Sequence, residues 1–274
     1  MTTQITNPFE SASENLEDHR IVSRDAWIAE RRALLAQEKE LTHLRDRITA
    51  RRRALPWVRV EKDYLFDTSD GKRSLAELFE GRHQLLVQHF MFAPGWEQGC
   101  QSCSFMADHA DGMLVHLAHR DVTLVAISRA TLPEIKRFRQ RMGWQFNWVS
   151  SHGSDFNYDF RVSFTPEEVA RGNLDYNYGG WPYSYEEWPG ISAFYRNDTG
   201  EIFHTYSTYG RGVEIMMGTY GMLDLVPKGR DEKDVEYKME WLRHHDRYEP
   251  APAKKTMGSS VAELFGTFSG GCCH

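Results

Sequence analysis

Long apolar runs are missing from this 274-residue sequence. The longest, such as LLVQHFMFA, fall far short of the roughly 20 residues that a membrane-spanning helix needs. The first twenty residues also lack the basic start and apolar stretch of a secretory signal. Cysteine is scarce, because four residues in a chain this long do not make the disulfide framework of a small secreted domain. They indicate local chemistry in a reducing compartment, so we expect a cytoplasmic protein with no membrane partner.

An excess of positive charge is absent as well. Lysine and arginine number 33 against 39 acidic residues, which gives a net charge of −6. This balance provides no general attraction to nucleic acid or to anionic lipid, so we expect no nucleic-acid partner. Charged residues make up 26% of the chain and hydrophobic residues 41%, as in ordinary globular proteins. The length corresponds to one large domain, or to one domain with additions.

Residues 1–56 read as a polar tail followed by a helical arm. Ser23 is a good N-cap, and the helix must end before Pro56. Apolar residues recur every seven positions and form one narrow seam, which consists of Trp27, Leu34, Leu41 and Ile48. We expect this seam to dock on the same domain or on a second subunit, which would make the protein a homodimer.

Residues 57–249 predict an α/β domain. Between Leu85 and Ser151, three buried strands alternate with two helices, expected from about Ser102 to His119 and over TLPEIKRFRQRMGW. This β-α-β-α-β order implies parallel strands with helical crossovers. Earlier, WVRV and YLF suggest short strands and a hairpin, and later the stretches ISAFYR and EIFHTYS form a second hairpin. A last helix is expected from about Val213 to Leu223.

Regular periodicity is lost between about Ser150 and Pro189, which we interpret as an insertion. Aromatic residues crowd its end: Trp181, Tyr183, Tyr185 and Trp188. Together with Trp96 they could line a substrate groove, although packing within the core or a lid is the simpler explanation. Residues 250–274 are rich in small residues and read as a flexible tail.

Two cysteines three positions apart, Cys100 and Cys103, are the central motif. They follow a buried strand and a short loop and open a helix within a β-α-β unit, which is the setting of a thioredoxin-like redox motif. A helix N-terminus stabilises a thiolate, which is the nucleophile in disulfide exchange. The apolar stripe of this helix turns Cys103 toward the core. We therefore expect Cys100 to attack and Cys103 to resolve the mixed disulfide.

Two other interpretations of the pair stay open. The cysteines could be inert and structural, or they could bind zinc together with Cys272, Cys273 and His274. Adjacent cysteines are awkward joint ligands, and no second CxxC or spaced histidine pair supports a tetrahedral site. We expect neither a metal nor a cofactor. On a mobile tail, Cys272 and Cys273 could instead relay electrons to Cys100, with adventitious metal binding or an added, non-native tail as the alternatives.

Five stretches of the sequence resemble a known bacterial family. They are EKELTHLRDRITARRRALPWVRVEKDYLFD, QHFMFAPGWEQGCQSCSFMAD, RMGWQFNWVSSHGSDFNYDF, FHTYSTYGRG and WLRHHDRYE. The family consists of thioredoxin-like proteins catalogued as domain of unknown function 899 and often described as predicted dithiol-disulfide oxidoreductases. The resemblance implies a thioredoxin-like fold, a central mixed sheet flanked by helices, with an N-terminal helical arm. It also matches Cys100 and Cys103 to the thioredoxin redox pair.

The resemblance also has departures. Thioredoxins carry a proline before the strand that faces the redox pair, and in GISAFYRNDTGE the corresponding position looks like Ser192. The segment before the motif looks like that of peroxiredoxins, yet the peroxiredoxin threonine ahead of the reactive cysteine is missing. Residues 96–99 read Trp-Glu-Gln-Gly instead. Both departures bear on how a substrate would bind.

Other polar residues carry two interpretations each. Arg129 follows a buried strand, where it could stabilise the Cys100 thiolate or an anionic substrate, or be a plain surface arginine. His89 reads as a hydrogen-bonded core histidine. Asp155, Asn157 and Asp159 could bind a cation or form turns. The sequence His244-His245-Asp246 resembles a set of metal ligands, or caps a helix end.

Three functions follow. The first is a dithiol-disulfide oxidoreductase that acts on a protein or small-molecule thiol or disulfide and is recharged by a reductant that the sequence does not name. The second is a peroxiredoxin-like peroxide reductase using Cys100, which the missing threonine disfavours. The third is a non-catalytic binding or assembly protein on a thioredoxin fold.

Overall fold

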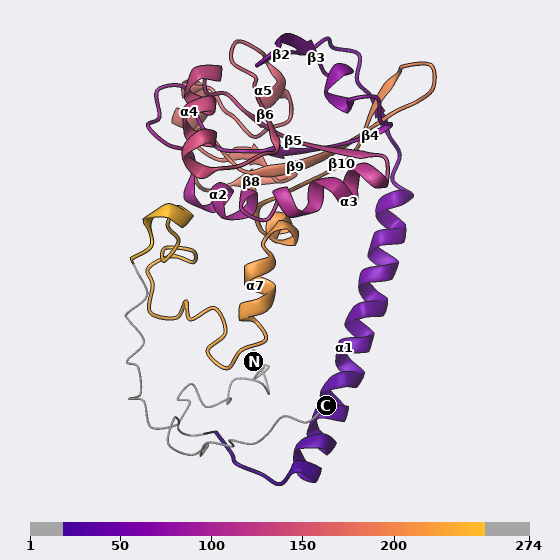
Figure 1. The fold of residues 1–274 in the computed structure, drawn as a ribbon, viewed down its shortest axis with the longest axis vertical. Coiled ribbons are helices and arrows are strands. Elements are labelled where there is room, and N and C mark those ends of the chain that lie inside the picture. Colours follow the sequence, from indigo (N-terminus) through magenta and orange to yellow (C-terminus); the bar gives the residue numbers. More distant parts are fainter. Residues whose placement is uncertain (1–18, 250–274) are drawn as a thin grey trace, which may run out of the picture.

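An eight-stranded mixed sheet forms the body of the protein in the computed structural model, which describes residues 19–249 (Figure 1). The strand order is β1-β10-β9-β4-β5-β6-β2-β3, and β7 and β8 form a separate pair. The strands are β1 (Val58–Arg59), β2 (Leu65–Thr68), β3 (Gly71–Ser74), β4 (Gln84–His89), β5 (Val122–Ser128), β6 (Asn147–Ser150), β7 (Leu174–Tyr176), β8 (Gly179–Trp181), β9 (Gly190–Arg196) and β10 (Ile202–Tyr209).

Short helices surround this sheet, and one long helix leaves it. The α-helices are α1 (Arg24–Arg53), α2 (Gln101–Ala107), α3 (Leu114–His119), α4 (Leu132–Met142), α5 (Phe156–Asp159), α6 (Pro166–Arg171) and α7 (Gly218–Leu223). Residues 19–249 also contain the 3-10 turns η2 (Glu77–Phe79), η3 (Asp111–Met113), η4 (Gly210–Met216) and η5 (His245–Arg247). In the described part of the chain, no helix is both long and apolar enough to cross a membrane.

The centre of the sheet confirms the predicted fold class. Strands β4, β5 and β6 run parallel and are connected through α2, α3 and α4. Strand β9 lies antiparallel to β4 on the other side, and β10 is antiparallel to β9. The chain therefore has a thioredoxin-like fold. Its two-cysteine motif follows the central strand β4 after one loop and opens α2.

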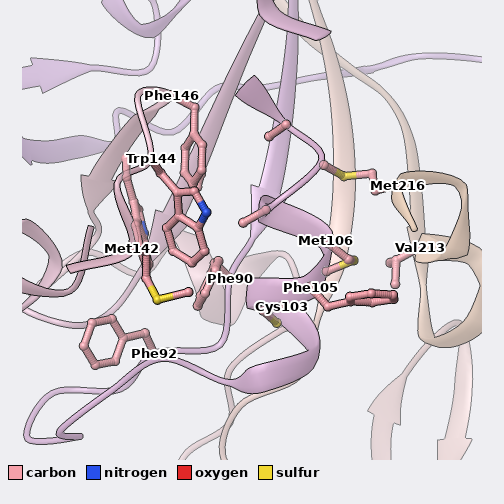
Figure 2. Packing of buried hydrophobic residues seen from close by; sticks show 14 of the residues in the cluster. Phe90, Phe92, Cys103, Phe105, Met106, Met142, Trp144, Phe146, Val213 and Met216 are labelled. Carbon is pink, nitrogen blue, oxygen red and sulfur yellow. The ribbon is translucent and has the colours of Figure 1, made fainter. Parts of the chain in front are cut away.

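Two apolar clusters fill the opposite faces of this sheet. One joins α2 and α4 to the sheet. It includes Cys103 and Met106 of α2, Phe138 of α4 and Trp148 of β6. Figure 2 shows Cys103 and Met106 beside the aromatic rings of Phe90 and Phe105. The other cluster joins η2 and α5 to the sheet through residues such as Val87 and Phe156. Because successive strand residues point to opposite faces, neighbours such as Val125 and Ala126 belong to different clusters.

The long helix α1 begins and ends where the sequence predicts. The Ser23 side chain accepts a hydrogen bond from the backbone N–H of Ala26, and the helix stops at Arg53. However, α1 buries none of its residues, and it projects away from the sheet (Figure 1). Trp27, Leu34 and Leu41 are about half exposed, at 55%, 50% and 49%. Docking of the seam on the described part of the same chain is therefore wrong, and a second subunit remains the alternative.

Three expectations about secondary structure need correction. The helix expected from Ser102 to His119 is broken into α2, η3 and α3. The last helix is likewise divided into η4 and α7. The stretch between Ser150 and Pro189 contains α5, α6, β7 and β8, and its tryptophans pack on a third apolar cluster that includes Phe164 and Tyr176. Cys272, Cys273 and His274, expected to form a thiol relay or a zinc site, lie outside the described residues.

Candidate redox site

Cys100 stands at the start of α2, at the end of the loop that follows β4. It is the N-cap residue of α2, it is half-buried, and its backbone has φ −58° and ψ 136°. Its backbone N–H donates to the carbonyl of Met91 across 3.0 Å, which ties the loop back to the end of the sheet. The Sγ atom lies 3.1 Å from the hydroxyl of Ser102. These contacts place the thiol where the free N–H groups of the helix gather.

Cys103 lies one turn further on and is completely buried, as the apolar stripe of the helix predicts. The backbone N–H of Met91 points at its Sγ atom across 3.4 Å. Met91 therefore contacts both cysteines, Cys100 through its carbonyl and Cys103 through its amide. Both cysteines are free thiols.

The two thiols differ sharply in acidity. The pKa of Cys100 is lowered to about 6, first because the Cys103 thiol donates a hydrogen bond to it and then because Ser102 does. Burial raises the pKa of the Cys103 thiol, and the negative charge of Cys100 raises it further. Cys100 is therefore a thiolate near neutral pH, while Cys103 keeps its proton. A half-buried thiolate is the form of cysteine that attacks a disulfide.

Glu187 is a buried acid near this pair that the sequence did not single out. It is 2% exposed, and its negative charge adds to the raised pKa of Cys103. Its carboxylate accepts hydrogen bonds from Arg129, at 2.6 Å, and from the Ser163 hydroxyl, at 2.9 Å. Burial raises the pKa of Glu187 itself. No sequence motif could have identified Glu187, because it stands in an aromatic stretch beside a second glutamate.

Arg129 is neither a free surface arginine nor a described partner of Cys100. Besides Glu187, its guanidinium donates to the Tyr158 hydroxyl and lies 3.7 Å from Glu186. The side chain is only 15% exposed. Its guanidinium neutralises a buried carboxylate, and within residues 19–249 it has no recorded contact with Cys100. Contact with an anionic substrate stays a prediction.

The expectation about Ser192 is wrong in position. Ser192 is the third residue of β9 and is completely buried. The residue that directly precedes β9 is Pro189, and the next residue, Gly190, pairs with His89 at the end of β4. A proline therefore does stand before the strand next to β4, at the end where the cysteines lie.

Ser192 belongs instead to a buried chain of hydrogen bonds. His89 Nε2 and the Ser192 hydroxyl are 2.7 Å apart, and the Ser192 and Ser207 hydroxyls are also 2.7 Å apart. The chain ends at His204, whose Nε2 atom is 2.7 Å from Ser207. Burial lowers the pKa of His89 to about 3, so the ring stays neutral. His89 is thus a hydrogen-bonded core histidine, as predicted.

The aromatic residues divide into two groups. Trp96 lies in the loop before Cys100, beside the site, and is 38% exposed. Trp181 and Trp188 pack around Tyr176, with ring centroids 5.3 and 5.0 Å away. Tyr183 and Tyr185 remain exposed. The tryptophans of the insertion are therefore packing residues, whereas Trp96 is partly exposed in the loop that leads to Cys100.

The candidate cation ligands are occupied by protein groups. Asp155 and Asp159 both accept hydrogen bonds from Lys62, at 2.7 and 2.8 Å. His244 and His245 point to different partners, the Gly99 carbonyl and Asp108 respectively. Across residues 19–249, no group of three or more histidine, cysteine or acidic side chains could hold a metal ion.

Several solved structures are similar to part of this chain at low sequence identity. Among solved structures, it is similar to peroxidoxin BcpB from Mycobacterium tuberculosis, with 12% identity and a TM-score of 0.39, over 58% of this chain and 91% of that one. It is also similar to peroxiredoxin Q from Xanthomonas campestris, with 12% identity and a TM-score of 0.39, over 57% and 87% of the two chains. The mitochondrial 2-Cys peroxiredoxin from Plasmodium falciparum gives 9% identity and a TM-score of 0.36, over 61% and 91%.

No curated protein matches the chain. A family model, in contrast, matches residues 16–248, which is most of the sequence and includes the arm, the sheet and both cysteines of the site. The chain therefore belongs to the family described as bacterial protein of unknown function (DUF899).

Proposed function

We propose that the protein is a thiol-disulfide oxidoreductase, in which Cys100 attacks and Cys103 resolves. The observation that carries this proposal is the contrast in the pair: a half-buried Cys100 with a pKa of about 6 beside a completely buried Cys103 with a raised pKa. A low-pKa thiolate with a protonated thiol within hydrogen-bonding reach supports exchange chemistry more directly than it supports a structural pair.

The reaction balances in two exchanges. The Cys100 thiolate attacks one sulfur of a substrate disulfide, forms a mixed disulfide and releases the other sulfur as a thiolate. Cys103 then loses its proton and attacks Cys100 Sγ, which closes the Cys100–Cys103 disulfide and releases the second substrate thiolate. The Cys103 proton goes to that departing thiolate. Two electrons pass from the protein to the substrate, and an external thiol or dithiol reductant restores the pair.

The substrate is expected to be a protein or a small molecule with an accessible disulfide, in the reducing compartment that the sparse cysteines indicate. We propose that the exposed Trp96, four residues before Cys100, and Pro189, directly before β9, contact this substrate. We propose further that Cys272 and Cys273 pass electrons to Cys100. A Cys272→Ser/Cys273→Ser variant that turns over as fast as the wild type with every reductant would remove this relay.

Trapping tests the central proposal. Cys103→Ser should accumulate a mixed disulfide on Cys100, visible by mass spectrometry, whereas Cys100→Ser should form none and should lose reduction of a model disulfide. Full activity of Cys100→Ser would contradict the assignment. Peroxide consumption without disulfide reduction would favour a peroxide reductase, and neither activity would favour a binding protein.

A further inference from the structure

The peptide group that joins Gly99 to Cys100 is held at both of its polar ends. Its N–H, on Cys100, donates to the Met91 carbonyl across 3.0 Å. Its carbonyl, on Gly99, accepts a hydrogen bond from His244 Nε2 across 2.8 Å. Because a peptide group is planar, fixing both ends fixes its orientation, and with it the direction of the N–Cα bond from which the Cys100 side chain is built.

His244 is built into this position. It is 2% exposed, and its ring packs edge-on against Phe138, with centroids 5.2 Å apart. Burial lowers the pKa of His244, so the ring is neutral at physiological pH. A carbonyl can only accept, so the Nε2 atom must carry the proton of this neutral ring. Phe138 also packs on Gly99, since a Cβ atom there would lie 2.9 Å from its ring.

The segment around His244 is bonded both to the loop before Cys100, through Arg141, and to the end of α2. The neighbouring Asp246 forms a two-pronged ion pair with Arg141, both bonds 2.8 Å long. Arg141 also donates to Gln98, the residue before Gly99, across 3.0 Å. On the other side, His245 lies 2.6 Å from Asp108, which follows α2. We call residues 242–247 the strap, because they clasp the loop and the helix that carry the two cysteines.

We propose that His244 is a positioning residue for Cys100: by donating to the Gly99 carbonyl, it holds the thiol in the place where Cys103 and Ser102 can hydrogen-bond to it. The proposal rests on the proposed function in that Cys100 is the reactive thiol. Without the His244 donor, the peptide group can turn, the hydrogen bonds that Cys100 receives lengthen, and its thiolate loses stabilisation.

The test uses the full chain with Cys272→Ser and Cys273→Ser as background, so that fewer thiols compete. The rate of iodoacetamide alkylation of Cys100 is followed against pH by peptide mapping. His244→Phe fills the space of the ring and removes the donor, whereas the amide nitrogen of His244→Gln replaces Nε2. The alkylation midpoint should move from about 6 toward the roughly 8.5 of a free cysteine in His244→Phe. His244→Gln should restore it.

A second readout is the reduction potential of the pair. Because loss of thiolate stabilisation disfavours the reduced form, the potential of His244→Phe should become more negative, and that of His244→Gln should stay near the wild-type value. An unchanged midpoint and potential in a His244→Phe protein that merely melts earlier would overturn the proposal and leave His244 as a packing residue.

Asp246→Asn provides an independent variant if His244→Phe does not fold. It weakens the ion pair with Arg141, loosens the strap without touching the core, and should move the midpoint in the same direction by a smaller amount. No movement would count against the proposal. Alkylation needs no disulfide substrate, so a wild-type protein that fails to reduce disulfides would refute the proposed function and leave this comparison intact.

Discussion

Gly99, the residue before Cys100, is tightly enclosed by aromatic rings. A Cβ atom at this position would lie 2.6 Å from the Phe90 ring and 2.9 Å from the Phe138 ring, and both rings are buried in the core. Gly99→Ala should therefore lower the free energy of unfolding by about 1–3 kcal/mol, as overpacking of a core does. Urea denaturation measures the change.

Gly112→Ala is the matched control, because a Cβ atom there meets nothing within 4 Å and the backbone is not left-handed. It should leave stability within about 0.5 kcal/mol of the wild type. Equal losses in the two variants would contradict the close packing at Gly99.

The acidity of Cys100 depends chiefly on its partner thiol. The hydrogen bond from Cys103 is the largest influence that lowers its pKa to about 6. As the pH rises through 6, alkylation of the reduced wild type should accelerate and then level off. Cys103→Ala removes the donor, so its midpoint should rise toward about 8.5. Ser102→Ala should give a smaller rise, and an unmoved midpoint in Cys103→Ala would assign the acidity to the helix start instead.

Glu187 and Arg129 form a buried ion pair whose members depend on each other. Glu187→Gln leaves the Arg129 charge without its closest partner and should cost about 3–5 kcal/mol of stability. Replacing both residues by Met should restore much of that loss, because an apolar pair of similar volume needs no desolvation of charge. Thermal melts of Glu187→Met, Arg129→Met and the double Met variant form the required cycle. Additive losses would show that the two residues do not act as a pair.

Among the elements, α1 has a stripe of apolar residues that nothing in residues 19–249 covers. We propose that a second copy of the chain covers it. Leu34→Glu/Leu41→Glu should then dissociate a dimer in sedimentation experiments. Ala36→Glu/Ala50→Glu adds the same charge on the opposite face of the helix and should leave the dimer intact. A wild-type protein that sediments as a monomer would refute the dimer.

The central elements could be predicted because their own residues determine them. Strands β4 and β5 are short apolar runs, and α4 carries its start signal in Thr131 and Glu134, which form a capping box. Cys100 and Cys103 are close together in the sequence, so their positions at the start of α2 followed from local pattern alone. Local signals of this kind survive folding because tertiary contacts do not oppose them.

The missed features depend on residues that are far apart in the sequence. The expected helix breaks after α2 because Asp108 accepts a hydrogen bond from Trp144, and Asp111 accepts from the backbone N–H groups of Gln145 and Phe146. Likewise, β9 begins at Gly190 because that residue pairs with His89. The burial of Glu187 depends on Arg129 and Ser163. No sequence spacing reports such pairings.

In the whole molecule, the strap joins the last described segment of the chain to the middle of the core. Leu242 is 1% exposed and belongs to the same apolar cluster as Cys103. A chain that stops before Leu242 loses this side chain and His244, a loss of at least about 3 kcal/mol by analogy with large core truncations. Its melting temperature should fall by roughly 2–4 °C for each kcal/mol lost.

A chain that stops after Glu249 keeps the strap and is the control for this truncation. It should melt close to the full-length protein by calorimetry. If both shortened chains melted at the same temperature, the strap would contribute nothing to the stability of the domain.

The hydrogen bond between His244 and Gly99 also has a consequence for biosynthesis. The two residues are 145 positions apart, so the ribosome has added more than half of the chain between making the first partner and the second. Until then, in the growing chain, the peptide group between Gly99 and Cys100 lacks the hydrogen bond to its carbonyl. If His244 positions Cys100 as proposed, the thiol reaches its final orientation only after residue 244 has been synthesised, when every described strand of the sheet has already been made.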